Sequence, residues 1–198
     1  MPTAKTTRGG GGGVAGLAWS LYLRRLERDP LRTKAVTAAC LQGCSDVVAQ
    51  KVAGKRALDA RRAALMALFG LCWAGPGLHY WHKFLEARFR GKKQTASLLL
   101  FKALLDQSLY GPVANLAMMS FITLLVERKT LEDLKSKVRD QFLSVQLNAY
   151  KVWPLASLVS YSFVPAELRV LFMNGVGFAW SLFLNLASSQ GKARRKKD

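Results

Sequence analysis

Five stretches of the chain carry almost no charge and are long enough to enter or cross a lipid bilayer. Asp46 interrupts the first of them and Asp106 the third. A bilayer core requires about 20 predominantly apolar residues per helix, so the second, third and fifth stretches are long enough, while the other two are short or unusually polar. This pattern predicts an all-α fold, a transmembrane helical bundle with a polar interior. The stretches are Ala35 to Gln50, Ala63 to His82, Ala103 to Val126, Val152 to Ala166 and Val170 to Gln190.

Charge is segregated between these stretches, although 21% of the residues are charged and the mean hydropathy is only +0.10. Nearly all of the 30 lysines and arginines lie in the loops and tails, which is typical of segments beside membrane spans. The net charge of +18 requires anionic partners, and phospholipid headgroups supply them at a membrane surface. No RNA- or DNA-binding motif accompanies the charge, so the sequence predicts no nucleic-acid partner.

The length of 198 residues predicts a single membrane-embedded domain, here residues 17–190, between two basic tails. Residues 1–16 include the glycine run Gly9 to Gly13 and contain no acidic residue, and residues 191–198 form a basic C-terminal tail. The acid-free N-terminal tail is typical either of an organelle transit peptide or of a flexible end. Three cysteines cannot all pair, and no apolar signal peptide precedes the domain, so the pattern does not favour secretion.

Polar residues within the first two stretches share helical faces. Asp46 and Gln50 follow Gly43 at three- and four-residue steps, on a face whose small residues allow close helix approach. They are predicted either to hydrogen-bond a neighbouring helix or to line a pathway.

In the second stretch, Gly75 and His79 lie on one face, and Pro76 is expected to kink or break the helix. Because this proline disrupts the register and no fourth ligand is nearby, the sequence predicts no metal site at Cys72, His79 and His82. Polar groups at such a break more often satisfy freed backbone groups or face water.

The third stretch contains Asp106, whose spacing from Lys102 allows an ion pair on one helix turn. An unpaired Asp near the centre of a membrane helix costs about 2.5 to 3.5 kcal/mol, so Asp106 is expected to face the bundle with a partner. Gln107 can bond across helices. Pro112 is expected to loosen the helix near Ser108, because its ring clashes with the carbonyl four residues earlier.

A different helix is predicted over Thr130 to Tyr150, where apolar residues form one stripe and charged residues lie elsewhere. Thr130 and Asp133 form a capping signal at its start. Such an amphipathic helix either lies flat in the headgroup region as an interfacial helix or packs on the bundle as a connector. Its stripe comprises Leu131, Leu134, Val138, Phe142 and Val145.

The last two stretches are joined by a tight turn containing Pro165 and Arg169, which predicts one re-entrant hairpin or two short spans. Trp153 and Tyr161 suit an interfacial aromatic belt or ordinary packing. The final helix is expected to turn a polar stripe toward the bundle or toward water. That stripe comprises Asn174, Gly177, Ser181, Asn185 and Ser188.

Motifs running nearly from end to end resemble the Mpv-seventeen family, also called the peroxisomal membrane protein twenty-two family. No single motif is specific, but their order and spacing together are. Two departures fall on the fourth stretch, where Ser157 and Ser160 stand in place of the usual Gln and Asn. The matching residues are Trp19 and Tyr22, Asp29 to Lys34, Asp46 and Gln50, Asp59 and Arg62, Gly75 and Pro76, His79 and Trp81, Lys102, Asp106, Gln107 and Pro112, Trp153 and Pro154, Val164 and Pro165, Arg169, and Trp180.

The resemblance implies a four-span protein of an organelle membrane, with the mitochondrial inner membrane favoured and the peroxisomal membrane as the alternative. Family members are proposed to form pores or to help metabolites cross. We therefore predict a channel or permeability factor for small metabolites or ions, and the alternative is a scaffold acting through partner proteins. No catalytic set of residues, cofactor or metal is predicted, and a homo-oligomer stays open.

Two groups of residues are assigned to these roles. The polar interior is predicted at Asp46, Gln50, His79, Lys102, Asp106 and Gln107. Helix breaks and packing contacts are predicted at Gly43, Gly75, Pro76, Pro112, Trp153, Pro154, Pro165, Arg169 and Trp180.

Overall fold

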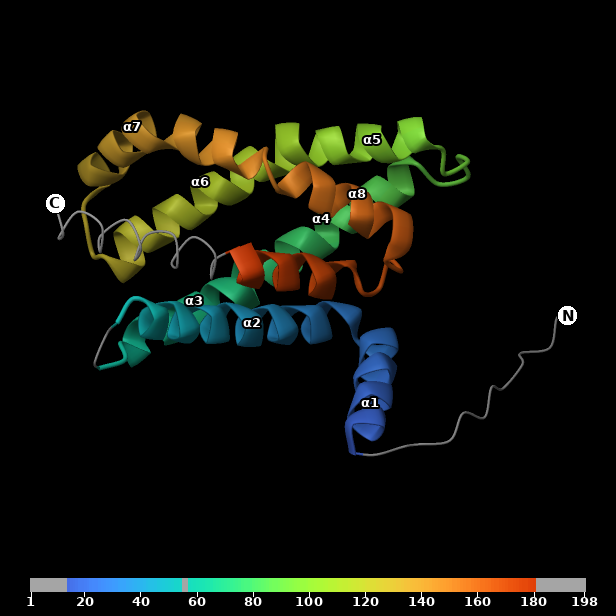
Figure 1. Cartoon of the computed structure of the whole chain (residues 1–198), viewed down its shortest axis with the longest axis horizontal. Helices are drawn as coiled ribbons and strands as arrows, with labels where there is room; N and C mark the ends of the chain where they lie inside the picture. Colours follow the sequence, from blue (N-terminus) through green and yellow to red (C-terminus); the bar gives the residue numbers. More distant parts are fainter. Residues whose placement is uncertain (1–13, 55–56, 181–198) are drawn as a thin grey trace, which may run out of the picture.

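The computed structural model describes residues 14–54 and 57–180, and these residues are helical with no strand among them (Figure 1). The predicted all-α fold is therefore confirmed. The chain is helical again over residues 169–180, beyond the last labelled helix. The labelled helices are α1 (Val14–Arg28), α2 (Pro30–Val52), α3 (Ala60–Phe69), α4 (Gly75–Arg88), α5 (Ala96–Leu105), α6 (Gly111–Phe121), α7 (Leu131–Ala149) and α8 (Trp153–Phe163).

Polar side chains start several of these helices, as expected from unsatisfied backbone N–H groups at helix N-termini. Asp29 caps α2 directly before Pro30, and Asp59 caps α3 by accepting from the Arg62 backbone N–H. The predicted capping box of α7 is confirmed, since Thr130 and Asp133 bond each other's backbone N–H groups.

Short π-helical turns join consecutive helices instead of breaking them. Gly70–Ala74 links α3 to α4, and Asp106–Tyr110 links α5 to α6. Each turn ends directly before a Gly-Pro pair, so the wider turn accommodates a proline that lacks an N–H and crowds the preceding carbonyl. Of the two outcomes expected at Pro76, a kink or a break, the chain does not break, because it stays helical through a π turn. The loosening predicted near Ser108 is confirmed as a π turn.

The helix containing the second π turn is the most membrane-like part of the fold. Among the described residues, only the continuous helix Ala96–Val126, 31 residues long, is apolar and long enough to cross a membrane. At 1.5 Å per residue it extends about 46 Å, more than the roughly 30 Å bilayer core. By the same measure α8, with 11 residues, extends only about 16 Å and is too short to cross on its own.

α2 packs against α3, the first π turn and α4, through the small-residue face predicted from the sequence. Gly70 and Gly75 both lie within this contact, opposite Ala38 and Ala35 of α2. A Cβ atom added at Gly75 would lie 2.6 Å from the Ala35 Cα atom, and one added at Gly70 would lie 2.5 Å from the Ala38 carbonyl oxygen. Only glycine lets the two backbones approach so closely.

The other helices complete the bundle. α7 packs along α6, which is the connector arrangement of the two predicted for this amphipathic helix, and α5 packs on α8. Of its predicted stripe, Leu134, Val138 and Phe142 are half-buried, while Leu131 and Val145 are exposed. Figure 1 shows α1 running across the direction of α2, and helix 169–180 returning beside α8 after a tight turn.

The described part of the molecule buries a set of polar residues beside its apolar core and exposes many large apolar side chains. Large apolar side chains are exposed along the membrane-like helix, including Leu100, Phe101 and Leu104. This combination is typical of a bundle whose outer surface meets lipid and whose interior polar groups bond across helices. The buried polar residues are Lys34, Ser45, Asp46, Gln50, His82, Lys102, Asp106, Gln107, Thr123, Gln146, Ser157 and Ser160.

Candidate functional site

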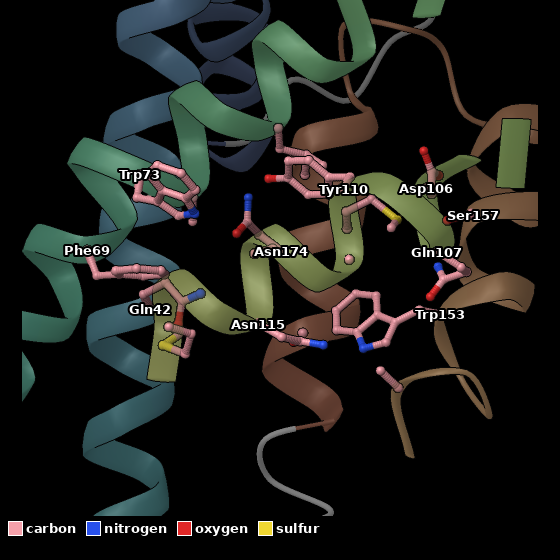
Figure 2. Close-up of a pocket in the computed structure, with 18 residues that line it drawn as sticks. Gln42, Phe69, Trp73, Asp106, Gln107, Tyr110, Asn115, Trp153, Ser157 and Asn174 are labelled. Carbon is pink, nitrogen blue, oxygen red and sulfur yellow. The ribbon is translucent and has the colours of Figure 1, made fainter. Parts of the chain in front are cut away.

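A cavity of about 210 Å³ lies between α2, both proline-associated π turns, α6, α8 and helix 169–180 (Figure 2). Its walls are mixed. Aromatic and aliphatic side chains such as Trp73, Leu78 and Trp153 alternate with polar ones. Such a cavity, mostly apolar with a few placed polar groups, is the usual form of a small-molecule site. The polar wall residues are Gln42, Asp106, Gln107, Tyr110, Asn115, Ser157 and Asn174.

The two π turns contribute much of this wall. Asp106, Gln107 and Tyr110 come from the second turn, and Trp73 and Ala74 come from the first. A π turn rotates the following residues relative to a regular α-helix, which changes the direction in which neighbouring side chains project. The prolines thus act on the site indirectly, by setting the turns that carry its residues.

Asp106 is held by two aromatic donors from other helices. The Trp81 indole Nε1 donates to Asp106 Oδ1 at 2.6 Å, and the Tyr161 hydroxyl lies 2.8 Å from both carboxylate oxygens. Asp106 is only 6% exposed. These donors stabilise a buried carboxylate that would otherwise be expensive to place there. As predicted, Asp106 faces the bundle and has partners.

Lys102, the ion-pair partner allowed by the sequence, is not the partner of Asp106. The structure contains no ion pair between these two residues, because the Lys102 ammonium instead bonds Gln94 Oε1 at 3.2 Å. Lys102 also lies over the Phe89 and Tyr161 rings, at 5.6 and 5.8 Å from their centroids. Spacing along one helix allowed the pair, but the neighbouring helix supplied better-placed donors to Asp106.

Tyr161 is the residue that connects this region. The Arg169 guanidinium lies 5.2 Å from its ring, and His82 meets the ring edge-on at 5.8 Å. Arg169 in turn pairs with Glu86 at 2.8 Å and donates to the Val164 carbonyl at 3.2 Å. The sequence suggested Tyr161 only as a belt or packing residue, because its contacts come from helices distant in the chain.

A chain of amides joins α6 and α7 beside the cavity. Asn115 Nδ2 donates to Gln146 Oε1 at 2.8 Å, and Gln146 Nε2 donates to the Gln107 carbonyl at 3.3 Å. Asn174, from the predicted polar stripe of the last helix, donates to the Val170 carbonyl at 2.8 Å. The rest of that stripe beyond Gly177 lies outside the described residues. Neither Asn115 nor Gln146 was assigned a role from the sequence, although Asn115 stands out as an amide within an apolar stretch.

Asp46 and Gln50 lie in a separate closed cluster and do not line the cavity. Arg62 Nε bonds Asp46 Oδ1 at 2.8 Å, and Gln50 Nε2 bonds Asp46 Oδ2 at 2.7 Å. The Gln50 side chain also accepts from the Asp59 backbone N–H at 2.7 Å and donates to its carbonyl at 3.1 Å. This arrangement clamps the end of α2 to the start of α3, as in the interface alternative predicted for these residues.

The remaining predicted residues occupy several positions. His79 is half-buried beside Tyr80 and, like Lys102, is absent from the cavity wall. Trp153 lines the cavity and, with Pro154, begins α8, while Pro165 lies in the turn before residue 169. Trp180 ends the described helix. Within residues 14–54 and 57–180, no three His, Cys, Asp or Glu side chains gather closely enough to hold a metal ion.

Comparison with known proteins now adds to this geometry. Residues 124–185 match the Mpv17 / PMP22 family. The chain is 35% identical over 165 residues to "Peroxisomal membrane protein PMP22" of Arabidopsis thaliana, a match covering 83% of this chain and 86% of that protein. It is 31% identical to "Protein sym-1" of Neurospora crassa, over 88% of this chain and 99% of that protein.

A further relative is "Mitochondrial inner membrane protein Mpv17" of Drosophila melanogaster, 28% identical over 76% of this chain and 91% of that protein. No solved structure matches the chain. The printed names place these relatives in peroxisomal and mitochondrial inner membranes, the two membranes expected from the sequence. With this similarity along most of its length, the chain belongs to the Mpv17 / PMP22 family.

Proposed function

We propose that this protein is an organelle integral membrane protein that lets small solutes cross through its central cavity. The observation that carries the proposal is a cavity of about 210 Å³ with seven polar wall residues inside a bundle whose outer surface is apolar. Polar groups inside a membrane bundle usually line a solute or ion pathway, or bond one another. The proposal assigns no catalytic turnover to this chain.

Four crossing units fit this proposal. They are α2, the α3–α4 helix, the helix Ala96–Val126, and the second half of α7 with α8. α2 has 23 residues and extends about 34 Å, enough for a bilayer core. Helix 169–180 would then pack among the four crossing units and supply Met173 and Asn174 to the cavity.

Phospholipid headgroups are the partners that we propose for the basic surface. α1 is the best-placed contact, because its first two turns expose Val14, Leu17 and Leu21 and its last turn carries Arg25 and Arg28. A helix with apolar side chains at one end and arginines at the other suits the boundary between acyl chains and anionic headgroups. We infer that α1 is the interfacial helix, whereas α7 packs on the bundle.

The mitochondrial inner membrane is the location we favour, because the N-terminal tail contains no acidic residue. The peroxisomal membrane is the alternative, and the names of the relatives support both. Imaging of the full-length protein with a C-terminal fluorescent tag, beside markers for both organelles, distinguishes them.

The experiment that tests the pathway is single-channel recording of the reconstituted protein beside the Asp106→Asn variant. Asp106 lines the cavity, so its neutralisation is expected to change ion preference or gating. Asp140→Asn is the matched control, because Asp140 is exposed on α7. Circular dichroism checks that all three proteins are folded. Absence of any conductance or solute flux from the well-folded wild type would contradict the proposal.

A scaffold without transport is the second candidate. It is favoured by the closed Asp46 cluster and by the two donors that already satisfy Asp106. On this alternative, Asp106→Asn lowers thermal stability in detergent and changes no flux, because the carboxylate acts only as an acceptor between helices. The same recordings, with melting curves added, therefore separate the two candidates.

A further inference from the structure

The hydrogen-bonding pattern of the cavity wall indicates which solutes it accepts. Asn174 is fixed in orientation, because its side chain bonds the Val170 carbonyl and a carbonyl can only accept. The amide nitrogen must therefore face that carbonyl. The Asn174 side-chain oxygen is left as the group without a partner among the described residues.

Asn115 is also fixed in orientation, through a chain of two hydrogen bonds. Gln146 bonds the backbone carbonyl of Gln107, so the Gln146 nitrogen is the donor there and its oxygen faces Asn115. Asn115 must then donate its own nitrogen to Gln146. Its side-chain oxygen is again left without a partner among the described residues. Two of the wall amides thus use one N–H for helix packing and leave their oxygen and a second N–H.

Ser157 and Asp106 add two more acceptors at one end of the cavity. Asp106 Oδ1 receives both the Trp81 and Tyr161 donors, whereas Oδ2 receives only Tyr161 of the two, so Oδ2 has acceptor capacity to spare. Ser157 is 1% exposed, lines the cavity and interacts with the Asp106 carboxylate. Figure 2 shows Ser157 beside Asp106. A hydroxyl that donates to a carboxylate keeps its oxygen as an acceptor for a solute.

No positive charge balances these acceptors. Among the described residues that line the cavity there is no lysine or arginine, and its donors are uncharged groups that include the amides of Gln42 and Gln107, the Tyr110 hydroxyl and the indole N–H groups of Trp73 and Trp153. The buried Lys102 and the half-buried Arg169 lie beyond Tyr161, where Gln94, Glu86 and aromatic rings contact them. The wall that a solute meets therefore carries no positively charged side chain among the described residues, although the protein has an overall charge of +18.

We propose that the cavity selects small uncharged polyhydroxyl solutes over carboxylates of the same size. This inference rests on the proposed function and names its solute class. Each hydroxyl of a polyol can donate one hydrogen bond. The acceptors for these donors are Asp106 Oδ2 and the side-chain oxygens of Ser157, Asn115 and Asn174. A cavity of about 150 Å³ holds benzene, so about 210 Å³ suits a solute of about eight non-hydrogen atoms.

A carboxylate of the same size fits this wall poorly. Its charged end would lie beside the Asp106 carboxylate, and the donors of the wall are all uncharged. It would also lose its hydration without a cation to replace it, and a buried charge without a partner is strongly disfavoured. Net positive charge on the outer surface can raise the local concentration of anions, but it does not change what the wall binds.

The test compares erythritol with erythronate, its carboxylate counterpart, by stopped-flow flux into liposomes that contain the full-length protein. We expect erythritol to cross at least tenfold faster per protein, after subtraction of protein-free liposomes. Ser157→Ala is expected to lower the erythritol rate several-fold. Ser162→Ala is the matched control, because Ser162 lies on the same helix and is exposed. Equal rates, or a faster carboxylate, would overturn the inference while leaving the proposed transport intact.

Equilibrium binding provides a readout that does not depend on transport. Saturation-transfer NMR on the detergent-solubilised protein is expected to detect erythritol and not erythronate, and Ser157→Ala is expected to weaken the erythritol signal. If this preference appears without flux of any solute, the proposed function fails and the inference on the cavity stands. If the protein is folded and shows no preference for erythritol, the inference is wrong whatever the flux.

Discussion

The close contact between α2 and α4 allows a sharp prediction for Gly75→Ala. The added Cβ would lie 2.6 Å from the Ala35 Cα atom and 3.1 Å from both the Ala35 nitrogen and the Lys34 carbonyl oxygen. Carbon atoms pack at about 3.5 to 4.0 Å, so the two helices must separate by about 1 Å. Backbone atoms form this contact, so no change of rotamer can relieve it.

The expected size of the effect comes from two opposing contributions. Overpacking a well-packed contact costs about 1 to 3 kcal/mol, and replacing a helical glycine by alanine returns about 0.5 to 1 kcal/mol. The free energy of unfolding is thus expected to fall by about 1 to 2 kcal/mol. Gly70→Ala is expected to act similarly, since its Cβ would lie 2.5 Å from the Ala38 carbonyl oxygen.

Gly77→Ala is the matched control, two residues away on the same helix. Its nearest new neighbour would be the Tyr110 hydroxyl at 3.4 Å, an ordinary contact, so the stability is expected to stay equal or to rise by a few tenths of a kcal/mol. Unfolding by SDS in mixed micelles, followed by tryptophan fluorescence, measures all three variants. A Gly75→Ala protein as stable as the Gly77→Ala protein would refute the reasoning.

Three further predictions concern other contacts. Arg62→Gln removes the ionic partner of Asp46, which is 5% exposed; because Arg62 is itself partly exposed, we expect a loss of about 1 to 3 kcal/mol in the same SDS assay, and an unchanged midpoint would contradict it. Tyr161→Phe removes the Tyr161 hydroxyl that donates to the Asp106 carboxylate and leaves the bond from Trp81. It is expected to lower stability by about 1 to 3 kcal/mol, measured by thermal melting in detergent, and an unchanged melting temperature would contradict this. Thr130→Ala is expected to destabilise the start of α7 by about 1 kcal/mol, read as faster amide hydrogen exchange there. Bonds from the Thr130 backbone N–H and hydroxyl lower the pKa of Asp133 below 3.8, so the stabilisation that the Asp133 carboxylate adds to this helix start is present above pH 3.8 and lost as the pH falls through the lowered pKa; protection factors, corrected for the intrinsic pH dependence of exchange, that stay unchanged in acid would contradict it.

Local patterns in the sequence were sufficient to predict the helices and part of the candidate site. The uncharged stretch around Asp106 predicted the membrane-like helix, and Thr130 with Asp133 predicted the start of α7. Asp106 and Gln107 were assigned to the polar interior, and both line the cavity. These features depend on neighbours within a few residues, because capping, helical periodicity and the burial cost of a charge all act over one or two turns.

Long-range packing decided what each polar residue contacts. Asp106 bonds Trp81 and Tyr161, at separations of 25 and 55 residues, and not the lysine one turn before it. Sequence spacing shows which residues share a helix face, but not which neighbouring helix that face meets. Sequence alone also left open whether Pro76 kinks or breaks its helix; in the structure the chain stays helical through a π turn in which Gly70 packs against α2.

By itself, the sequence determined an all-helical chain with apolar stretches, basic connections and a few buried polar groups. Only the tertiary structure showed which of those groups bond one another, as Asp46 does in the cluster that joins α2 to α3, and which of them line the cavity. The physical reason is that a polar side chain within a bundle takes whichever partner the neighbouring helices bring within hydrogen-bond distance. Where they bring one, the group stabilises the fold, and where they bring none, as at the side-chain oxygen of Asn174, it stays available to a solute.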